Sequence, residues 1–178
     1  MKYLIYLVAI VFLLGVNVGI FPYLRSFGTT PNLLLLFTLL VVFEKHDSSF
    51  FFVGFLSGLF LDFFSGAFLG TFTFSFLLAV FLLYLISKHF LLLSEVNWKN
   101  LCIMLFLSIL IVHILAWLYN LAVFKLSWSA QSLPLGIFTW RFLAEIIYNL
   151  ALLYPVYIFT ALVQKLNLNF EMGKIKPY

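Results

Sequence analysis

Apolar residues fill most of the chain in long runs, and short clusters of polar or turn-forming residues separate these runs. A long apolar run with few charges is typical of a transmembrane helix. The pattern predicts an all-α integral membrane protein, a six-transmembrane-helix bundle in a single domain, residues 1–178. The expected spans are residues 3–24, 31–43, 49–63, 66–87, 101–124 and 141–163.

The longest uninterrupted apolar stretch, residues 49–87, must turn back on itself. As one helix it would be roughly 58 Å long, about twice the roughly 30 Å of a hydrocarbon core. Ser65 and Gly66 are the expected corner, because glycine readily adopts turn conformations. A five-span alternative, in which residues 49–63 form a re-entrant hairpin, stays open.

The start of the second span is marked by two threonines, Thr29 and Thr30, followed by Pro31 and Asn32. A threonine cap with proline at the first helical position favours a helix start here. Pro31 and Asn32 are therefore expected to set where this helix begins. Residues 88–100 are expected to lie in the headgroup region, and Leu133, Pro134 and Gly136 are expected to break the chain before the last span.

Composition supports a membrane environment, with 65% hydrophobic and 9% charged residues. Soluble domains average about 25% charged residues. The net charge of +4 comes from scattered basic residues without a patch, which argues against nucleic acid. Seven of them fall on one side of the predicted topology and three on the other, which predicts that both termini are cytoplasmic. These are Lys2, Lys45, Lys88, Lys99, Lys165, Lys174 and Lys176, against Arg25, Lys125 and Arg141.

The most informative pattern is a set of five residues spaced four apart: Gly54, Gly58, Asp62, Gly66 and Gly70. On a continuous helix they would form one stripe along which a neighbouring backbone can approach closely. We expect this stripe to pack helices within one subunit, with a partner interface as the alternative. Asp62 has two interpretations: a cap for the backbone amides of the next helix, or a functional acid in the membrane interior.

The last span carries further polar residues, Arg141, Glu145 and Asn149. Arg141 and Glu145 are four apart, so they are expected to pair on one helix face or to form a polar patch for a partner. His113 is expected to make an interior hydrogen bond. Cys102 is a single cysteine, and no ligand cluster surrounds His113, so we predict no metal and no cofactor. No arrangement of nucleophile and base, phosphate loop or paired carboxylates is present, so we predict no enzyme activity.

Two parts of the chain resemble a known family. Pro31, Asn32 and Leu33 are followed by the ordered pattern G-x3-G-L-x2-D-x3-G-x2-L-G, and together they resemble the rod shape-determining protein MreD family. The matching residues are Gly54, Gly58, Leu59, Asp62, Gly66, Leu69 and Gly70. Glu145, Asn149 and Pro155 look like the last helix of that family. Residues 88–133 match only in hydropathy.

This resemblance implies a non-enzymatic component of the bacterial cytoplasmic (inner) membrane. The family belongs to the cell-elongation, or rod, complex that controls cell shape and lateral peptidoglycan synthesis. The implied direct partner is MreC, and the wider complex includes MreB, RodZ, RodA and a class B penicillin-binding protein. Membrane lipids are further partners. The family fold is thought to be similar to the substrate-binding subunits of energy-coupling-factor transporters.

An alternative function is a membrane-embedded small-molecule-binding subunit of a vitamin-type transporter. Such a subunit needs a concave site with convergent polar groups. In the sequence, Asp62, Arg141, Glu145 and Asn149 are too few and too dispersed to indicate one.

Overall fold

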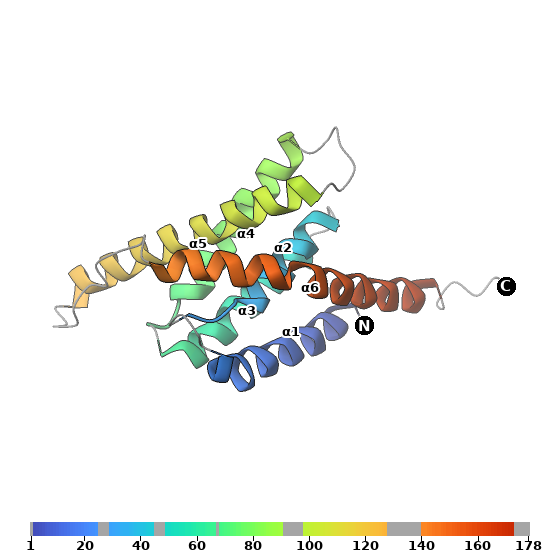
Figure 1. Ribbon diagram of the computed structural model, residues 1–178, viewed down its shortest axis with the longest axis horizontal. Coiled ribbons are helices and arrows are strands. Elements are labelled where there is room, and N and C mark those ends of the chain that lie inside the picture. The colour runs from blue at the N-terminus through green and yellow to red at the C-terminus, as the bar shows by residue number, and fades with distance from the viewer. Residues whose placement is uncertain are drawn as a thin grey trace.

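The computed structural model describes residues 2–24, 29–44, 49–66, 68–90, 98–127 and 140–172, and these fold into helices without a strand (Figure 1). The elements are α1 (Lys2–Gly19), the short 3-10 helix η1 (Phe21–Leu24), α2 (Leu33–Glu44), α3 (Ser49–Ser65), α4 (Thr71–Phe90), α5 (Trp98–Ser127) and α6 (Trp140–Met172).

Each predicted span corresponds to a helix, but the helix ends differ. The first predicted span divides at Gly19, because glycine weakens a helix and Pro22 cannot supply the amide that would continue it. The expected corner is confirmed: α3 ends at Ser65, and Gly66 has a positive φ of 68°. The fourth helix begins at Thr71 rather than at Gly66. Leu133, Pro134 and Gly136 lie outside the described residues, as do residues 91–97 of the predicted headgroup segment.

Three helical segments of the described chain are long and apolar enough to cross a membrane: Lys2–Tyr23, Trp98–Val123 and Trp140–Asn167. The other apolar helices are shorter, at Leu33–Phe43, Ser49–Ser65 and Thr71–Ile86. The helix α3 is continuous, so the chain does not reverse within residues 49–63 as a re-entrant hairpin would require. The structure thus supports a helical membrane protein in which three helical segments are long and apolar enough to cross the membrane.

The shortest α-helix of the described chain, α2, lies at the centre of the bundle. Its 12 residues extend over only about 18 Å. It contacts all five other α-helices, and residues 33–42 are buried on every side. A helix that is apolar all round is expected where no face meets water. The run of leucines and valines in α2 therefore forms the core of the bundle.

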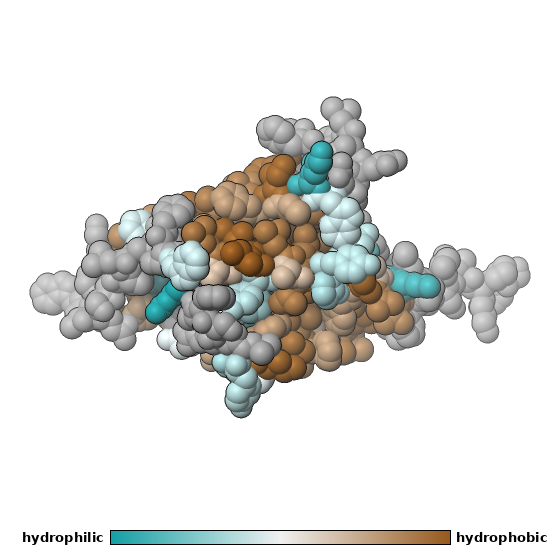
Figure 2. Space-filling view, in the orientation of Figure 1, coloured by the Kyte–Doolittle hydropathy of each residue, from teal (hydrophilic) through white to brown (hydrophobic). Residues whose placement is uncertain are grey.

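The surrounding helices expose apolar side chains outward. Apolar residues cover most of the coloured middle of the visible face, and the most hydrophilic residues lie toward its edges (Figure 2). Fully exposed apolar side chains are favourable in lipid, whereas in water such a surface marks an interaction site. The start of α1 and the end of α6 lie at the same end of the bundle (Figure 1). We call the opposite end, where α1 ends and α2 begins, the η1 end.

Candidate functional site

Asp62 lies in the last turn of α3 and is only 3% exposed. Its carboxylate accepts hydrogen bonds from the backbone amides of Gly70 at 3.0 Å, Phe72 at 2.7 Å and Thr73 at 3.0 Å, and from the Thr73 hydroxyl. The first amides of a helix have no partner within that helix, so α4 needs acceptors here. Asp62 supplies them from the preceding helix. These contacts match the capping interpretation of Asp62.

Gly54 and Gly58 lie where α3 packs against α4. A Cβ atom at Gly58 would lie 2.6 Å from the Thr73 Cα and 2.8 Å from the Phe72 carbonyl oxygen. A Cβ at Gly54 would lie 3.0 Å from Val80 Cγ2. Backbone cannot move aside as a flexible side chain can, so Gly58 permits the close approach of the first turn of α4. That approach brings the amides of Phe72 and Thr73 within reach of Asp62.

The predicted five-residue stripe is wrong beyond Asp62. The helix ends at Ser65, so Gly66 and Gly70 lie in the connection, with φ of 68° and 96°. L-residues with a side chain rarely adopt these values. A Cβ at Gly70 would also lie 2.6 Å from the Tyr119 hydroxyl oxygen. These two glycines therefore shape a turn rather than a helix contact.

Helix α5 holds this turn in place from the side. The Tyr119 hydroxyl donates to the Leu69 carbonyl at 2.8 Å, and the Thr71 hydroxyl donates to Asn120 Oδ1 at 3.1 Å. Tyr119 and Asn120 were not among the residues predicted from the sequence. Their only sequence signal is that they are polar side chains within a long apolar helix. We call the assembly of Gly58, Asp62, Gly66, Gly70 and Tyr119 the α3–α4 corner.

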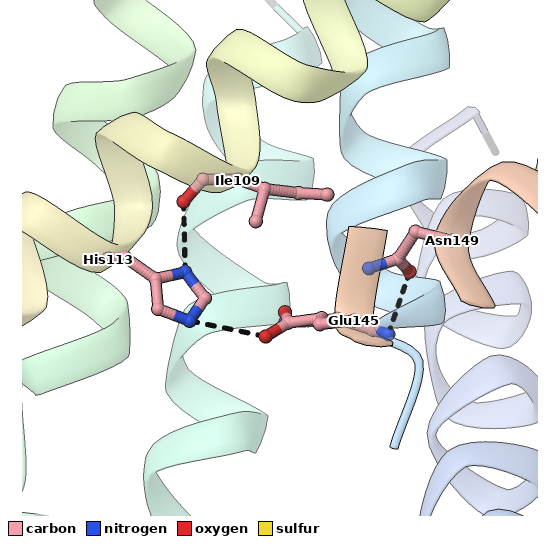
Figure 3. A network of polar contacts seen from close by, with 5 residues as sticks. Ile109, His113, Glu145 and Asn149 are labelled. Atoms are coloured by element: carbon pink, nitrogen blue, oxygen red, sulfur yellow. Dashed lines mark hydrogen bonds and ion pairs between the residues drawn. The ribbon is translucent and has the colours of Figure 1, made fainter. Parts of the chain in front are cut away.

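A second polar group gathers where α2 begins. Asn32 Oδ1 accepts the Leu35 amide at 3.1 Å, and the Asn32 amide donates to Asn149 Oδ1 of α6 at 2.9 Å (Figure 3). Asn17 Oδ1 lies 3.5 Å from the Leu33 amide. Asn32 is thus the N-cap of α2, and the predicted threonine cap with Pro31 at the first helical position is wrong. Asparagine caps as well as threonine does, and its side chain is the one in position here.

Glu145 of α6 points toward His113 of α5, and Oε2 lies 3.1 Å from His113 Nε2 (Figure 3). His113 Nδ1 lies 2.9 Å from the Ile109 carbonyl oxygen. The interior hydrogen bond expected for His113 is confirmed. The expected pair between Arg141 and Glu145 is wrong: Arg141 is exposed and the described structure contains no ion pair between them. The neighbouring helix offers Glu145 a closer partner.

The contacts of the His113 ring constrain its protons. Nδ1 carries a hydrogen, because the Ile109 carbonyl oxygen can only accept. Nε2 is the ring nitrogen that faces Glu145.

Next to this pair is a pocket of about 370 Å³ at the η1 end. The chain segments that meet there come from α1, η1, the start of α2, the end of α3, the start of α4, α5 and α6. The pocket is lined by Asn17, Val18, Pro22, Thr29, Thr30, Pro31, Asn32, Leu61, Phe64, Ser65, Phe72, Val112, His113 and Glu145. Its size is at the lower end of the range for small-molecule sites.

The fold thus groups the predicted residues into two places. Gly58, Asp62, Gly66 and Gly70 belong to the α3–α4 corner, and Gly54 packs against α4 beside it. Pro31, Asn32 and Glu145 line the pocket, and Asn149 contacts Asn32. Arg141 belongs to neither. Asn17 was missed, and its signal was again a lone amide in an apolar helix. In the described part of the chain, no group of three or more His, Cys, Asp or Glu residues is arranged to hold a metal ion.

Compared with models of known protein families, with curated proteins and with solved structures, the chain shows no match. Function is therefore inferred from the residues and their contacts.

Proposed function

We propose that the chain is a non-enzymatic membrane component of the bacterial cell-elongation complex, that it binds MreC, and that it helps to control cell shape and lateral peptidoglycan synthesis. The observation that carries the proposal is the α3–α4 corner. In the sequence, the glycines and the aspartate of the MreD-like pattern are related only by their spacing. In the fold, they together shape the connection between α3 and α4. Asp62 caps α4, Gly58 permits the close contact, and Gly66 and Gly70 allow the turn.

Such a corner suits partner recognition because hydrogen bonds to Asp62 and Tyr119 hold Leu69, Gly70 and the start of α4 without a partner. A preorganised surface loses less conformational entropy on binding. Around the corner, Phe64 and Leu69 are 59% and 67% exposed, so the turn presents apolar side chains outward from a rigid frame. We propose that the membrane-proximal segment of MreC contacts this turn.

Co-purification with MreC from nanodiscs tests the proposal, and crosslinking locates the contact. Cys102 is first replaced by Ala, so that Leu69→Cys provides a single thiol at the turn. The matched control is Ile147→Cys. Ile147 is 62% exposed, and it lies on α6, a helix that contributes no residue to the corner. We expect Leu69→Cys, and not Ile147→Cys, to crosslink to single cysteines in the membrane-proximal segment of MreC.

Two results would count against the proposal. If the folded protein forms no complex with MreC in nanodiscs or in detergent, the assigned function is wrong. If the complex forms but Ile147→Cys crosslinks as strongly as Leu69→Cys, the corner is not the contact surface.

A second candidate is a membrane-embedded small-molecule-binding subunit, as in vitamin-type transporters. One observation favours it: the fold brings Asn17, Asn32, His113 and Glu145 around one pocket. A ligand that binds only the folded state raises its thermal stability with increasing ligand concentration. A panel of vitamins tested by thermal shift would support this candidate through a concentration-dependent rise, and a uniform lack of effect would oppose it.

A further inference from the structure

We propose that the pocket at the η1 end binds the ammonium group of a small primary amine, with Glu145 as its counter-ion. This inference rests on the second candidate function, a small-molecule-binding role, and does not depend on binding to MreC. It names the chemical class of the ligand from the groups that line the pocket.

The first reason is the unused hydrogen-bonding capacity of Glu145. A carboxylate accepts hydrogen bonds at two oxygens. Oε2 contacts His113, whereas the other oxygen has no hydrogen bond to any residue in the described part of the chain. The side chain is 13% exposed and lines the pocket, so a ligand that donates hydrogen bonds can reach the carboxylate from the pocket.

The contrast with Asp62 shows that the open position at Glu145 is particular to this site. Both oxygens of Asp62 already accept hydrogen bonds from α4, and Asp62 does not line the pocket. Only Glu145, of the two acids within the helices around the η1 end, has an acceptor left over. A ligand donor is the group that satisfies it.

The second reason is the direction of the helices that end there. The last turns of α1 and α3, represented by Asn17, Val18, Leu61 and Ser65, line the pocket. A helix C-terminus has carbonyl oxygens without partners and a partial negative charge. The N-termini of α2 and α4, which have the opposite polarity, are capped by Asn32 and Asp62. The pocket therefore favours a cation that donates hydrogen bonds.

The third reason is the remaining wall. Phe64 and Phe72 line the pocket, and aromatic faces attract ammonium groups. The described lining contains no lysine or arginine, and its basic side chain, His113, contacts Glu145 through Nε2. The hydroxyls of Thr29 and Thr30 and the amide of Asn17 can contact an oxygen atom next to the amine. Ethanolamine has this combination, either as a free molecule or as the headgroup of phosphatidylethanolamine.

The experiment measures thermal unfolding of the full chain in nanodiscs of phosphatidylcholine, whose quaternary ammonium has no N–H to donate. Ethanolamine is titrated against ethylene glycol, which replaces the amine by a hydroxyl of similar size. We expect a saturable rise in the unfolding midpoint with ethanolamine and no comparable rise with ethylene glycol. The rise should be lost in Glu145→Gln and kept in Arg141→Gln, which alters an exposed residue one helical turn away.

A second variant guards against misfolding of Glu145→Gln. Val18→Phe adds bulk to the pocket wall while leaving Glu145 and His113 unchanged. It should also abolish the ethanolamine effect. The proposal is overturned if ethanolamine gives no saturable shift in the parent, if ethylene glycol acts equally, or if Val18→Phe and Glu145→Gln, both folded, respond as the parent does.

Lipid composition then distinguishes the two sources of the amine. If nanodiscs with phosphatidylethanolamine stabilise the parent but not Glu145→Gln, and free ethanolamine adds nothing further, the ligand is the lipid headgroup. If free ethanolamine stabilises equally in both lipids, the ligand is a free amine. A shift with a vitamin but not with ethanolamine would reject this ligand class while keeping the small-molecule-binding role.

Discussion

Two acids lie within the apolar helices near the η1 end, and their surroundings differ. Asp62 accepts four hydrogen bonds, one from Gly70 and three from the start of α4, and it does not line the pocket. Glu145 contacts His113 through one oxygen and lines the pocket. In the sequence the two residues look alike, since each is an isolated acid in an apolar segment.

The difference indicates how each acid is used. A buried charge is tolerated when nearby donors surround it, and the fully surrounded acid then holds a fold together. An acid with spare acceptor capacity beside a cavity is positioned to receive a ligand. We therefore expect substitutions at the α3–α4 corner to affect stability and partner binding, and substitutions at the pocket to affect ligand binding with smaller changes in stability.

The largest expected effect is that of Asp62→Leu. The substitution leaves the amides of Gly70, Phe72 and Thr73 without acceptors. Each unsatisfied buried donor costs about 1–3 kcal/mol, so we expect a loss of about 3–9 kcal/mol. Equilibrium unfolding in detergent measures this loss.

Asp62→Asn is the matched control. It keeps one acceptor oxygen but places an amide donor against the donors of α4, so its loss should be smaller than that of Asp62→Leu. If Asp62→Leu unfolds at the same denaturant concentration as the parent, the cap is not important for stability.

Gly58→Ala should have the next largest effect. The added Cβ would lie 2.6 Å from the Thr73 Cα, and separating two packed helices typically costs about 1–3 kcal/mol. Gly15→Ala is the control, because no atom lies within 4 Å of a Cβ at that position. Since alanine favours a helix more than glycine, Gly15→Ala should be neutral or stabilising. Equal unfolding midpoints for the two variants would show that the contact at Gly58 is easily relieved.

Gly66→Ala tests the turn itself. At a φ of 68° an alanine side chain is strained by roughly 1–2 kcal/mol. Asparagine tolerates this region better, so Gly66→Asn should recover part of the loss. Because nothing lies within 4 Å of a Cβ here, any difference between the two variants reports backbone strain rather than a clash. Thermal unfolding in the same detergent gives the comparison, and equal losses would contradict it.

The smallest expected effect is the coupling between His113 and Glu145. The two side chains are 31% and 13% exposed, so solvent weakens their interaction. A double-mutant cycle with His113→Ala and Glu145→Ala should give a coupling of about 0.5–1 kcal/mol. A coupling of several kcal/mol would mean that the contact between His113 and Glu145 is mainly structural, as the contacts of Asp62 are. The proposed difference in role between Asp62 and Glu145 would then be wrong.

Several features follow from the sequence because they depend on composition and local geometry. The apolar runs are sufficient to indicate a helical membrane protein and the approximate position of each helix. The corner at Ser65 and Gly66 follows because one helix from residue 49 to 87 would be too long for a membrane. For Asp62 the sequence left two interpretations open, a cap of the next helix and a functional acid in the membrane interior. Its position close to the corner is compatible with both.

Only the tertiary structure decided which polar side chains meet. Asn32 and Asn149 are 117 positions apart, and His113 and Glu145 lie on different helices. Helices that are apolar on every side give no periodic signal for the face that packs inward, so the sequence could not indicate that α2 is central. For the same reason it could not indicate that Glu145 contacts His113 of α5 rather than pairing with Arg141. Those contacts depend on how six helices of unequal length fit together in the described chain, and local patterns do not encode that fit.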